Sequence, residues 1–217
     1  FSKQHKGFLF GANEVPDHPN AIKTIEKYLK KGAVVIGEQK FGIDCDAPQM
    51  QRIYELAQEY NVPVILHWQF QLYNYGIDRF HTMLEKYPRV NFIGHAQSWW
   101  SFMDKNYIDA PEMYPPGKIT PGGLTDRLLA DYPNMYGDLS AASGYNMLTR
   151  DEEMAKNILV RHQNKLMFGS DCPDPAGFGT GYLCQGIRTI NQIRKLASNR
   201  QIERKILYEN AKNLFRI

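Results

Sequence analysis

Two histidines and two carboxylates stand at the ends of short apolar runs, where they could bind a metal ion. These residues are His67 in "PVILH", His95 in "VNFIGH", Asp171 in "LMFGSD" and Glu38 in "AVVIGE". Histidine and carboxylate ligands around an open position suit Zn²⁺ or a similar divalent ion, which lowers the pKa of bound water to about 7. Each residue also has a structural alternative, such as a hydrogen-bonded histidine or a helix-capping aspartate.

The apolar runs that precede these residues predict buried parallel strands, because a strand covered on both faces is continuously apolar. Six strands are expected, at 7–12, 33–38, 63–67, 90–95, 135–140 and 166–171. Amphipathic helical patterns lie between them, at 18–32, 46–60, 76–88 and 182–197. Alternating strands and helices predict a parallel sheet with helices outside, which is either an open doubly wound sheet or a (β/α)8 TIM barrel.

The barrel is favoured because no glycine-rich phosphate fingerprint follows any candidate strand. In a barrel the carboxyl ends of the strands meet at one rim, so the four candidate ligands are expected to converge there. Six βα units are visible, whereas a closed barrel needs eight and typically about 250 residues. The chain starts at Phe1, and we therefore expect one barrel domain, residues 1–217, whose first two units lie upstream.

One connection is much longer than the others, at about 97–133. It is rich in aromatic residues, proline and glycine, and it begins "QSWWSFMDKNY". Loops of this length in a compact domain are usually functional or disordered, and the adjacent Trp99 and Trp100 favour a lid or pocket wall. The alternative is a surface excursion whose tryptophans only cover the barrel.

Composition limits the classes of partner. The 217 residues are 43% hydrophobic with a formal net charge of +3, and the charges are interleaved, which argues against a nucleic-acid or membrane surface. A small-molecule substrate is expected, and a homo-oligomer is possible. No apolar run approaches the roughly 20 residues of a membrane span. Three cysteines without metal-binding spacing make a disulfide framework improbable, which favours a reducing, cytoplasmic location unless an export signal lies upstream.

Several of these segments together resemble the amidohydrolase superfamily. The segments are "PVILHWQ", "FIGHAQ", "YGDLSAASGYN", "LMFGSDCPD" and "ILYENAKNLFRI". The nearest branch is the amidohydrolase-2 group of metal-dependent hydrolases and non-oxidative decarboxylases. This resemblance implies a metal-bearing (β/α)8 barrel with His67 and His95 as ligands on the fifth and sixth strands. It also implies that Asp171 binds metal and moves protons.

The segment "IGEQKFGID" is similar to a motif of the TatD-like deoxyribonucleases, in which a glutamate bridges two metals. Glu38 is therefore a further candidate ligand, with Lys40 as a lesser candidate for the carboxylated lysine of other branches. The chain departs from the family pattern in one respect, because the first-strand H-x-H pair occurs nowhere in it. We expect that pair upstream, and without it metal binding and catalysis would both be in doubt.

These observations predict a metal-dependent hydrolase that acts on a small amide, ester or lactone-like substrate. Asp171 would take the proton from the attacking water and return it to the leaving group. Candidate substrate-binding residues are Trp99, Trp100, Tyr145 and Arg150, although Arg150 could equally pair with Asp151. Two alternatives stay open: a metal-dependent non-oxidative decarboxylase and a noncatalytic barrel remnant that acts as a binding protein.

Overall fold

The computed structural model describes residues 7–174 and 184–217. Within these ranges there are five strands: β1 (Ile36–Gln39), β2 (Val64–His67), β3 (Phe92–His95), β4 (Met135–Asp138) and β5 (Leu166–Met167). The α-helices are α1 (Ala21–Leu29), α2 (Pro48–Tyr60), α3 (His81–Lys86), α4 (Gln97–Ser101), α5 (Leu124–Asp131), α6 (Ala141–Arg150), α7 (Glu152–Arg161), α8 (Gly186–Leu196), α9 (Arg200–Arg204) and α10 (Asn210–Phe215). A 3₁₀ turn, η1 (Ile77–Arg79), precedes α3, and a π-helical turn, η2 (Lys205–Glu209), joins α9 to α10.

The strands form one parallel sheet in the order β1-β2-β3-β4-β5. Spatial order follows chain order without the reversal that defines a doubly wound sheet. This arrangement is that of a barrel wall, and the expected parallel α/β fold is confirmed. Of the expected strand at 7–12, only Ala12 forms a parallel bridge, to Ile36 at the outer side of β1. The expected strand at 166–171 is also shorter, because only its first two residues pair.

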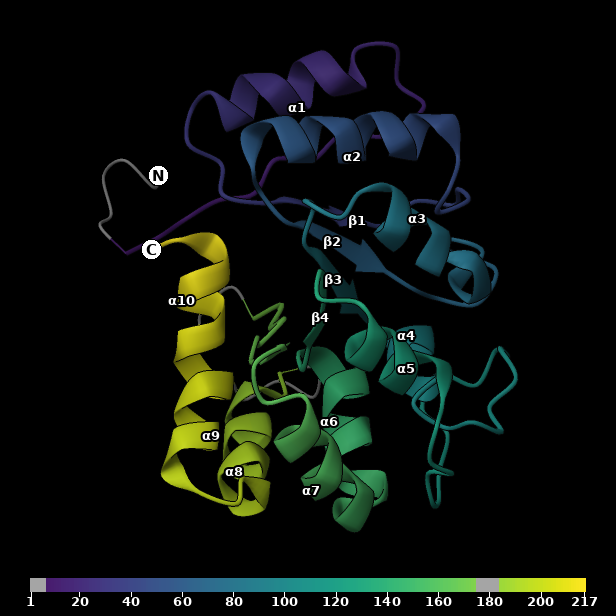
Figure 1. Ribbon diagram of the computed structural model, residues 1–217, viewed down its shortest axis with the longest axis vertical. Coiled ribbons are helices and arrows are strands. Elements are labelled where there is room, and N and C mark those ends of the chain that lie inside the picture. Colours follow the sequence, from purple (N-terminus) through teal and green to yellow (C-terminus); the bar gives the residue numbers. More distant parts are fainter. Residues whose placement is uncertain (1–6, 175–183) are drawn as a thin grey trace.

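Most of the helices cover one face of the sheet, whereas α10 packs against the other face. Figure 1 shows α1 and α2 side by side at one end of the molecule, with α6, α7 and α8 grouped at the other. The main hydrophobic core lies between these helices and alternate strand residues, among them Val64, Leu66, Phe92, Met135 and Leu166. The intervening strand residues face the opposite side, because successive side chains of a strand alternate.

That opposite side holds a smaller apolar cluster. Ile93 and Met167 pack with Leu214 of α10, and Ile65 and Tyr136 lie partly buried beside them. His67 and His95 lie two residues after Ile65 and Ile93 respectively, so both histidines share this face at the carboxyl end of their strands. The sheet therefore separates a structural core from the face that carries the candidate ligands.

The long connection begins with α4, and its two tryptophans are core residues. Trp99 and Trp100 are almost fully buried in the main core. A Cβ added at Gly94 of β3 would clash with the Trp99 ring, and Trp100 Nε1 donates a hydrogen bond to the Asp138 carbonyl at 2.8 Å. This placement favours the covering role that the sequence left open as an alternative. The rest of the connection, from 102 to 123, contains no helix or strand.

Cysteine pairing differs from the expectation. Cys172 and Cys184 form a disulfide with their Cα atoms 4.6 Å apart, and Cys45 is a buried free thiol. The prediction that disulfides are improbable is therefore wrong for this pair, because cysteine spacing in the sequence does not report distance in the fold. The expected helix at 182–197 is observed as α8, and its first two residues lie outside the described ranges. No helix within those ranges is both long and apolar enough to span a membrane.

Candidate metal centre

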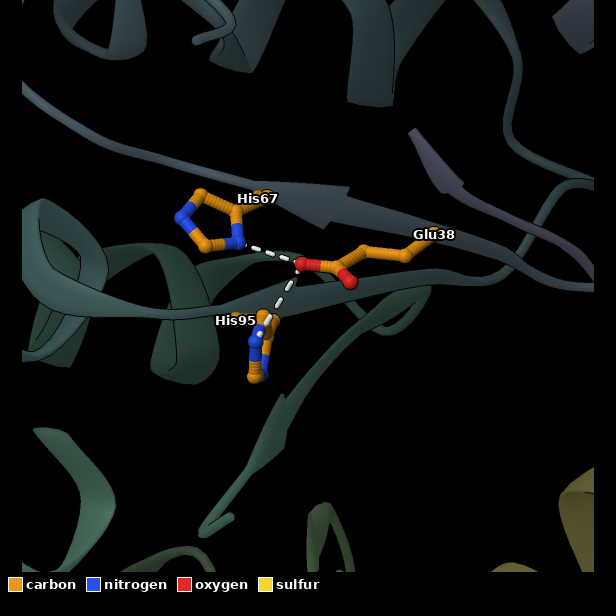
Figure 2. Close-up of side chains that lie close together, drawn as sticks. All are labelled: Glu38, His67 and His95. Atoms are coloured by element: carbon orange, nitrogen blue, oxygen red, sulfur yellow. Dashed lines mark hydrogen bonds and ion pairs between the residues drawn. The ribbon is translucent and has the colours of Figure 1, made fainter. Parts of the chain in front are cut away.

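Glu38, His67 and His95 come together at the carboxyl ends of three adjacent strands. Each contributes one potential ligand atom, and these atoms all lie within 4.8 Å of one another. Figure 2 shows the Glu38 carboxylate between the two imidazole rings. The parallel register pairs His67 directly with His95, and β1 places Glu38 beside them. The convergence expected from the strand ends is therefore observed for these three residues.

Both histidines are buried, with 4% of each residue exposed, whereas Glu38 is half-buried. Glu38 Oε1 contacts His67 Nδ1 and lies 3.4 Å from His95 Nε2. Burial tends to raise the pKa of Glu38, but the hydrogen bond with His67 and the positive potential of His95 lower it overall. The glutamate is thus held as a carboxylate, which is the form that binds cations.

Asp138, on β4, orients the second histidine. His95 Nδ1 donates to Asp138 Oδ2 at 3.0 Å, and Ser140 Oγ donates to the same oxygen at 2.7 Å. This bond leaves His95 Nε2 directed toward Glu38. Burial tends to lower the pKa of His95, but the bond to Asp138 and the negative charges of Asp138, Glu38 and Asp171 together outweigh it and raise that pKa. A carboxylate behind a ligating imidazole fixes the tautomer and strengthens the ligand.

Gln69 orients His67 in the way that Asp138 orients His95. His67 Nε2 lies 3.1 Å from Gln69 Oε1, so that Nδ1 is the nitrogen directed at Glu38. The ring also packs edge-on against Tyr73 and His95, with centroids 5.2 Å away in each case. Two oriented imidazoles and one carboxylate match the His₂Glu donor set of catalytic zinc sites. The residues present therefore fit a divalent ion.

Asp171 lies at the edge of this cluster. Its Oδ2 atom is 3.9 Å from His95 Nε2, and 53% of its side chain is exposed. Partial burial raises its pKa, and the nearby carboxylates of Glu38 and Asp138 add to the effect against an opposing contribution from His95. Asp171 is thus separated from the three clustered ligands but close enough to exchange protons with groups bound there.

The other candidate residues occupy different surroundings. Arg150 is buried, donates to the Pro115 carbonyl at 3.2 Å and lies 3.8 Å from Asp104, so it anchors the 102–123 segment rather than pairing with Asp151. Tyr145, on α6, carries the Arg188 guanidinium over its ring at 5.0 Å. Lys40 is exposed and lies over the Tyr73 ring, outside the ligand cluster.

Two residues of the site were not predicted. Asp138 is the last residue of β4, whereas the strand expected at 135–140 ends two residues later, at Ser140. Asn74 is buried in a loop, and its side-chain nitrogen donates to the carbonyls of Gln39 (2.6 Å) and His67 (2.7 Å). It thereby ties the ends of β1 and β2 together, and no local sequence signal indicates this role.

The C-terminal part of the chain matches a known family. A family model described as Amidohydrolase matches residues 125–217, whereas no curated protein sequence matches the chain. The matched region includes β4 with Asp138 and the segment that contains Asp171. It does not include Glu38, His67 or His95.

Solved structures with a similar fold extend over the whole chain. An uncharacterised TIM-barrel protein from Bordetella bronchiseptica has a TM-score of 0.69 at 13% identity, covering 99% of this chain and 69% of its own. A 2,6-dihydroxybenzoate decarboxylase from Rhizobium scores 0.61 at 16% identity, covering 99% and 73%. A probable 2-pyrone-4,6-dicarboxylic acid hydrolase from Acinetobacter baumannii scores 0.62 at 16% identity, covering 100% and 76%. At these identities the likeness shows the fold alone.

Proposed function

From the match of residues 125–217 to a family model described as Amidohydrolase, we propose that the chain is a metal-dependent hydrolase of a small amide, ester or lactone-like substrate. The observation that carries the proposal is the cluster of Glu38, His67 and His95 at the carboxyl ends of adjacent parallel strands. Active sites of (β/α)8 barrels are built at this end of the strands. The family match and the ligand cluster come from different parts of the chain, so they support the proposal independently.

Zn²⁺ is the ion that we propose, held by His67, His95 and Glu38. When bound, such an ion lowers the pKa of a water molecule and polarises a carbonyl group. Asp138 and Gln69 keep the two imidazoles oriented before the ion arrives, since each bonds the nitrogen that is turned away from Glu38. This preorganisation reduces the cost of assembling the site.

Asp171 is the proposed proton carrier. Its partial exposure and its position beside His95 allow it to accept a proton from the attacking water and donate it to the leaving group. A raised pKa suits this exchange, because a group that titrates closer to neutrality both accepts and returns protons readily. Its half-exposed side chain also gives protons a route to solvent.

Metal analysis of the purified protein tests the proposal. We expect stoichiometric zinc by inductively coupled plasma mass spectrometry, and loss of that zinc in His67→Ala and His95→Ala. His18→Ala provides a matched control, because His18 is exposed and lies outside the cluster. Hydrolysis of a panel of nitrophenyl esters, anilides and lactones should require the metal. A folded protein that binds no divalent ion would contradict the proposal and would favour the noncatalytic binding protein.

Non-oxidative decarboxylation is the second candidate, supported by the fold likeness to the 2,6-dihydroxybenzoate decarboxylase. The same three residues would hold the ion, and Asp171 would deliver a proton to carbon instead of to a leaving group. Incubation with aromatic acids and capture of released CO₂ distinguishes the two reactions. CO₂ release without ester or amide cleavage would replace hydrolysis with decarboxylation.

A further inference from the structure

A pocket of about 410 Å³ with both apolar and polar walls adjoins the candidate metal centre. Gln69 belongs to its wall and also contacts His67 Nε2, so the pocket begins one side chain away from the cluster. Phe70, Tyr75 and Ile77 supply apolar surface on its wall, and Asp109 supplies a carboxylate. The pocket and the candidate metal centre therefore share the Gln69 side chain as a common wall.

Asp109 is a partly buried carboxylate for which the described chain provides no ion pair. Ser98 Oγ donates a hydrogen bond to Asp109 Oδ1 at 2.8 Å. Burial raises the pKa of Asp109, while hydrogen bonds from Ser98, the Ala110 backbone and Tyr107 oppose that rise. A buried charge is costly unless it is paired, so this carboxylate is suited to a positively charged ligand.

Three other polar atoms of residues that line these pockets have no hydrogen-bond partner within the described ranges. Asn74 Oδ1 and Trp68 Nε1 belong to residues that line this pocket, and both atoms are buried without a hydrogen bond in the described ranges. Gln97 Oε1 is also buried without a hydrogen bond. Gln97 lines an adjoining pocket of about 420 Å³, which shares Gln69 and Ser98 with the first pocket. These atoms are enclosed within the walls and have almost no accessible surface, so they do not contact a ligand in the pocket directly.

Cationic side chains are missing from the walls of both pockets as the structure describes them. Arg150 does not supply one, because it lines neither of the two pockets. Recognition of a carboxylate normally uses arginine or lysine. The pocket is thus electrostatically opposed to an anionic group and complementary to a cationic one.

We propose that Asp109 is a specificity residue that binds an ammonium group of the substrate, while the reacting group lies at the His67 and His95 centre. This inference rests on the proposed function for the position of the reacting group. The carboxylate itself needs neither metal nor turnover to bind a cation, so its role can be tested separately.

Three probes of similar size and different charge test this proposal: 2-phenylethylammonium, 2-phenylethanol and phenylacetate. Their phenyl ring suits the apolar wall, and binding to the whole chain is measured by isothermal titration calorimetry at low salt. We expect the ammonium to bind most tightly and phenylacetate least tightly. Asp109→Asn should weaken binding of the ammonium by about 10-fold or more and leave binding of the alcohol nearly unchanged, because only the charge pair is lost.

Two further variants complete the experiment. Asp109→Glu keeps the charge and should retain the preference for the ammonium. Glu153→Gln removes one negative charge from an exposed position on α7 and should leave the ranking unchanged. Equal binding of the three probes, tighter binding of phenylacetate, or no effect of Asp109→Asn in a protein that still folds would overturn the proposal. Absence of metal or turnover would contradict the proposed function and leave these binding results intact.

Discussion

Asp138 Oδ2 accepts a hydrogen bond from His95 Nδ1 at 3.0 Å, which makes a residue of β4 responsible for the direction of an imidazole on β3. Ser140 reinforces the arrangement, since its hydroxyl donates to the same carboxylate oxygen. The candidate metal centre therefore depends on four strands, although its three clustered candidate ligands come from only three.

Replacement of Asp138 should weaken metal binding without removing a ligand. We expect Asp138→Asn to lower zinc affinity by about 10- to 100-fold, because the amide cannot stabilise the protonated Nδ1 in the same way. Competition with a fluorescent zinc chelator measures the change. Ser140→Ala should give a smaller loss, and unchanged affinity in Asp138→Asn would contradict the orienting role.

Asp171 should affect turnover more than metal content. Asp171→Asn removes the group that accepts and returns the proton, and general acid–base groups typically contribute about 10²- to 10⁴-fold in rate. We expect a fall of that size in kcat with zinc retained and the circular dichroism spectrum unchanged. Full activity in the variant would exclude this role, whereas loss of zinc would make Asp171 primarily a ligand.

Asn74 should stabilise the site through the strand ends that it joins. Asn74→Gly tolerates the positive φ of 46° at this position but removes both bonds to the Gln39 and His67 carbonyls. We expect the free energy of unfolding to fall by about 1–3 kcal/mol, the cost of leaving buried polar groups unsatisfied. Urea denaturation measures it. Asn61→Gly is the matched control, since Asn61 has a φ of 53° at the exposed end of α2 and should show no comparable loss.

A buried pair away from the metal centre should make stability depend on pH. Burial tends to raise the pKa of Asp126, but bonds from His162 Nε2 (2.7 Å) and Arg161 lower it overall. A carboxyl with a depressed pKa stabilises the fold above its unfolded pKa of about 3.9, and that contribution is lost as pH falls through the folded value.

Asp126→Asn should accordingly have a lower free energy of unfolding than the parent protein near neutral pH. This difference in unfolding free energy should become smaller in acid. Denaturation with urea between about pH 3 and pH 7 follows the difference in unfolding free energy. Asp131→Asn, an exposed change on the same helix, should show no such trend. A constant difference across this range would mean that the charge of Asp126 is not what stabilises the fold.

The strand ends could be predicted from sequence because a buried parallel strand leaves an uninterrupted apolar run. The histidine that follows each run is then positioned by the strand itself, as His67 and His95 show. The long connection could not be interpreted in this way. Trp99 belongs to the core because Gly94 leaves space for its ring above β3, and Trp100 packs over Gly137 of β4. Both spaces are properties of packing between distant elements.

Packing between separate segments also explains why the sequence did not reveal the contacts of Arg150 and Asp109 or the Cys172–Cys184 disulfide. Each is defined by a partner far along the chain: the Pro115 carbonyl for Arg150, Ser98 for Asp109 and a second cysteine for the disulfide. Nothing in the local pattern of residue types encodes such distances. Only side-chain geometry separates a substrate-binding arginine from one that anchors a loop.

The sequence by itself determined the parallel α/β fold and placed Glu38, His67 and His95 at the carboxyl ends of strands, since strand periodicity and side-chain chemistry are local properties. Asp171, expected at the end of a strand, lies four residues beyond the end of β5. The tertiary structure decided which of these residues cluster. It separated Asp171 from the three that approach one another, and it added Asp138 and Asn74 as the residues that orient and join them. Ligand geometry depends on the register of neighbouring strands, and register is decided by packing across the whole sheet.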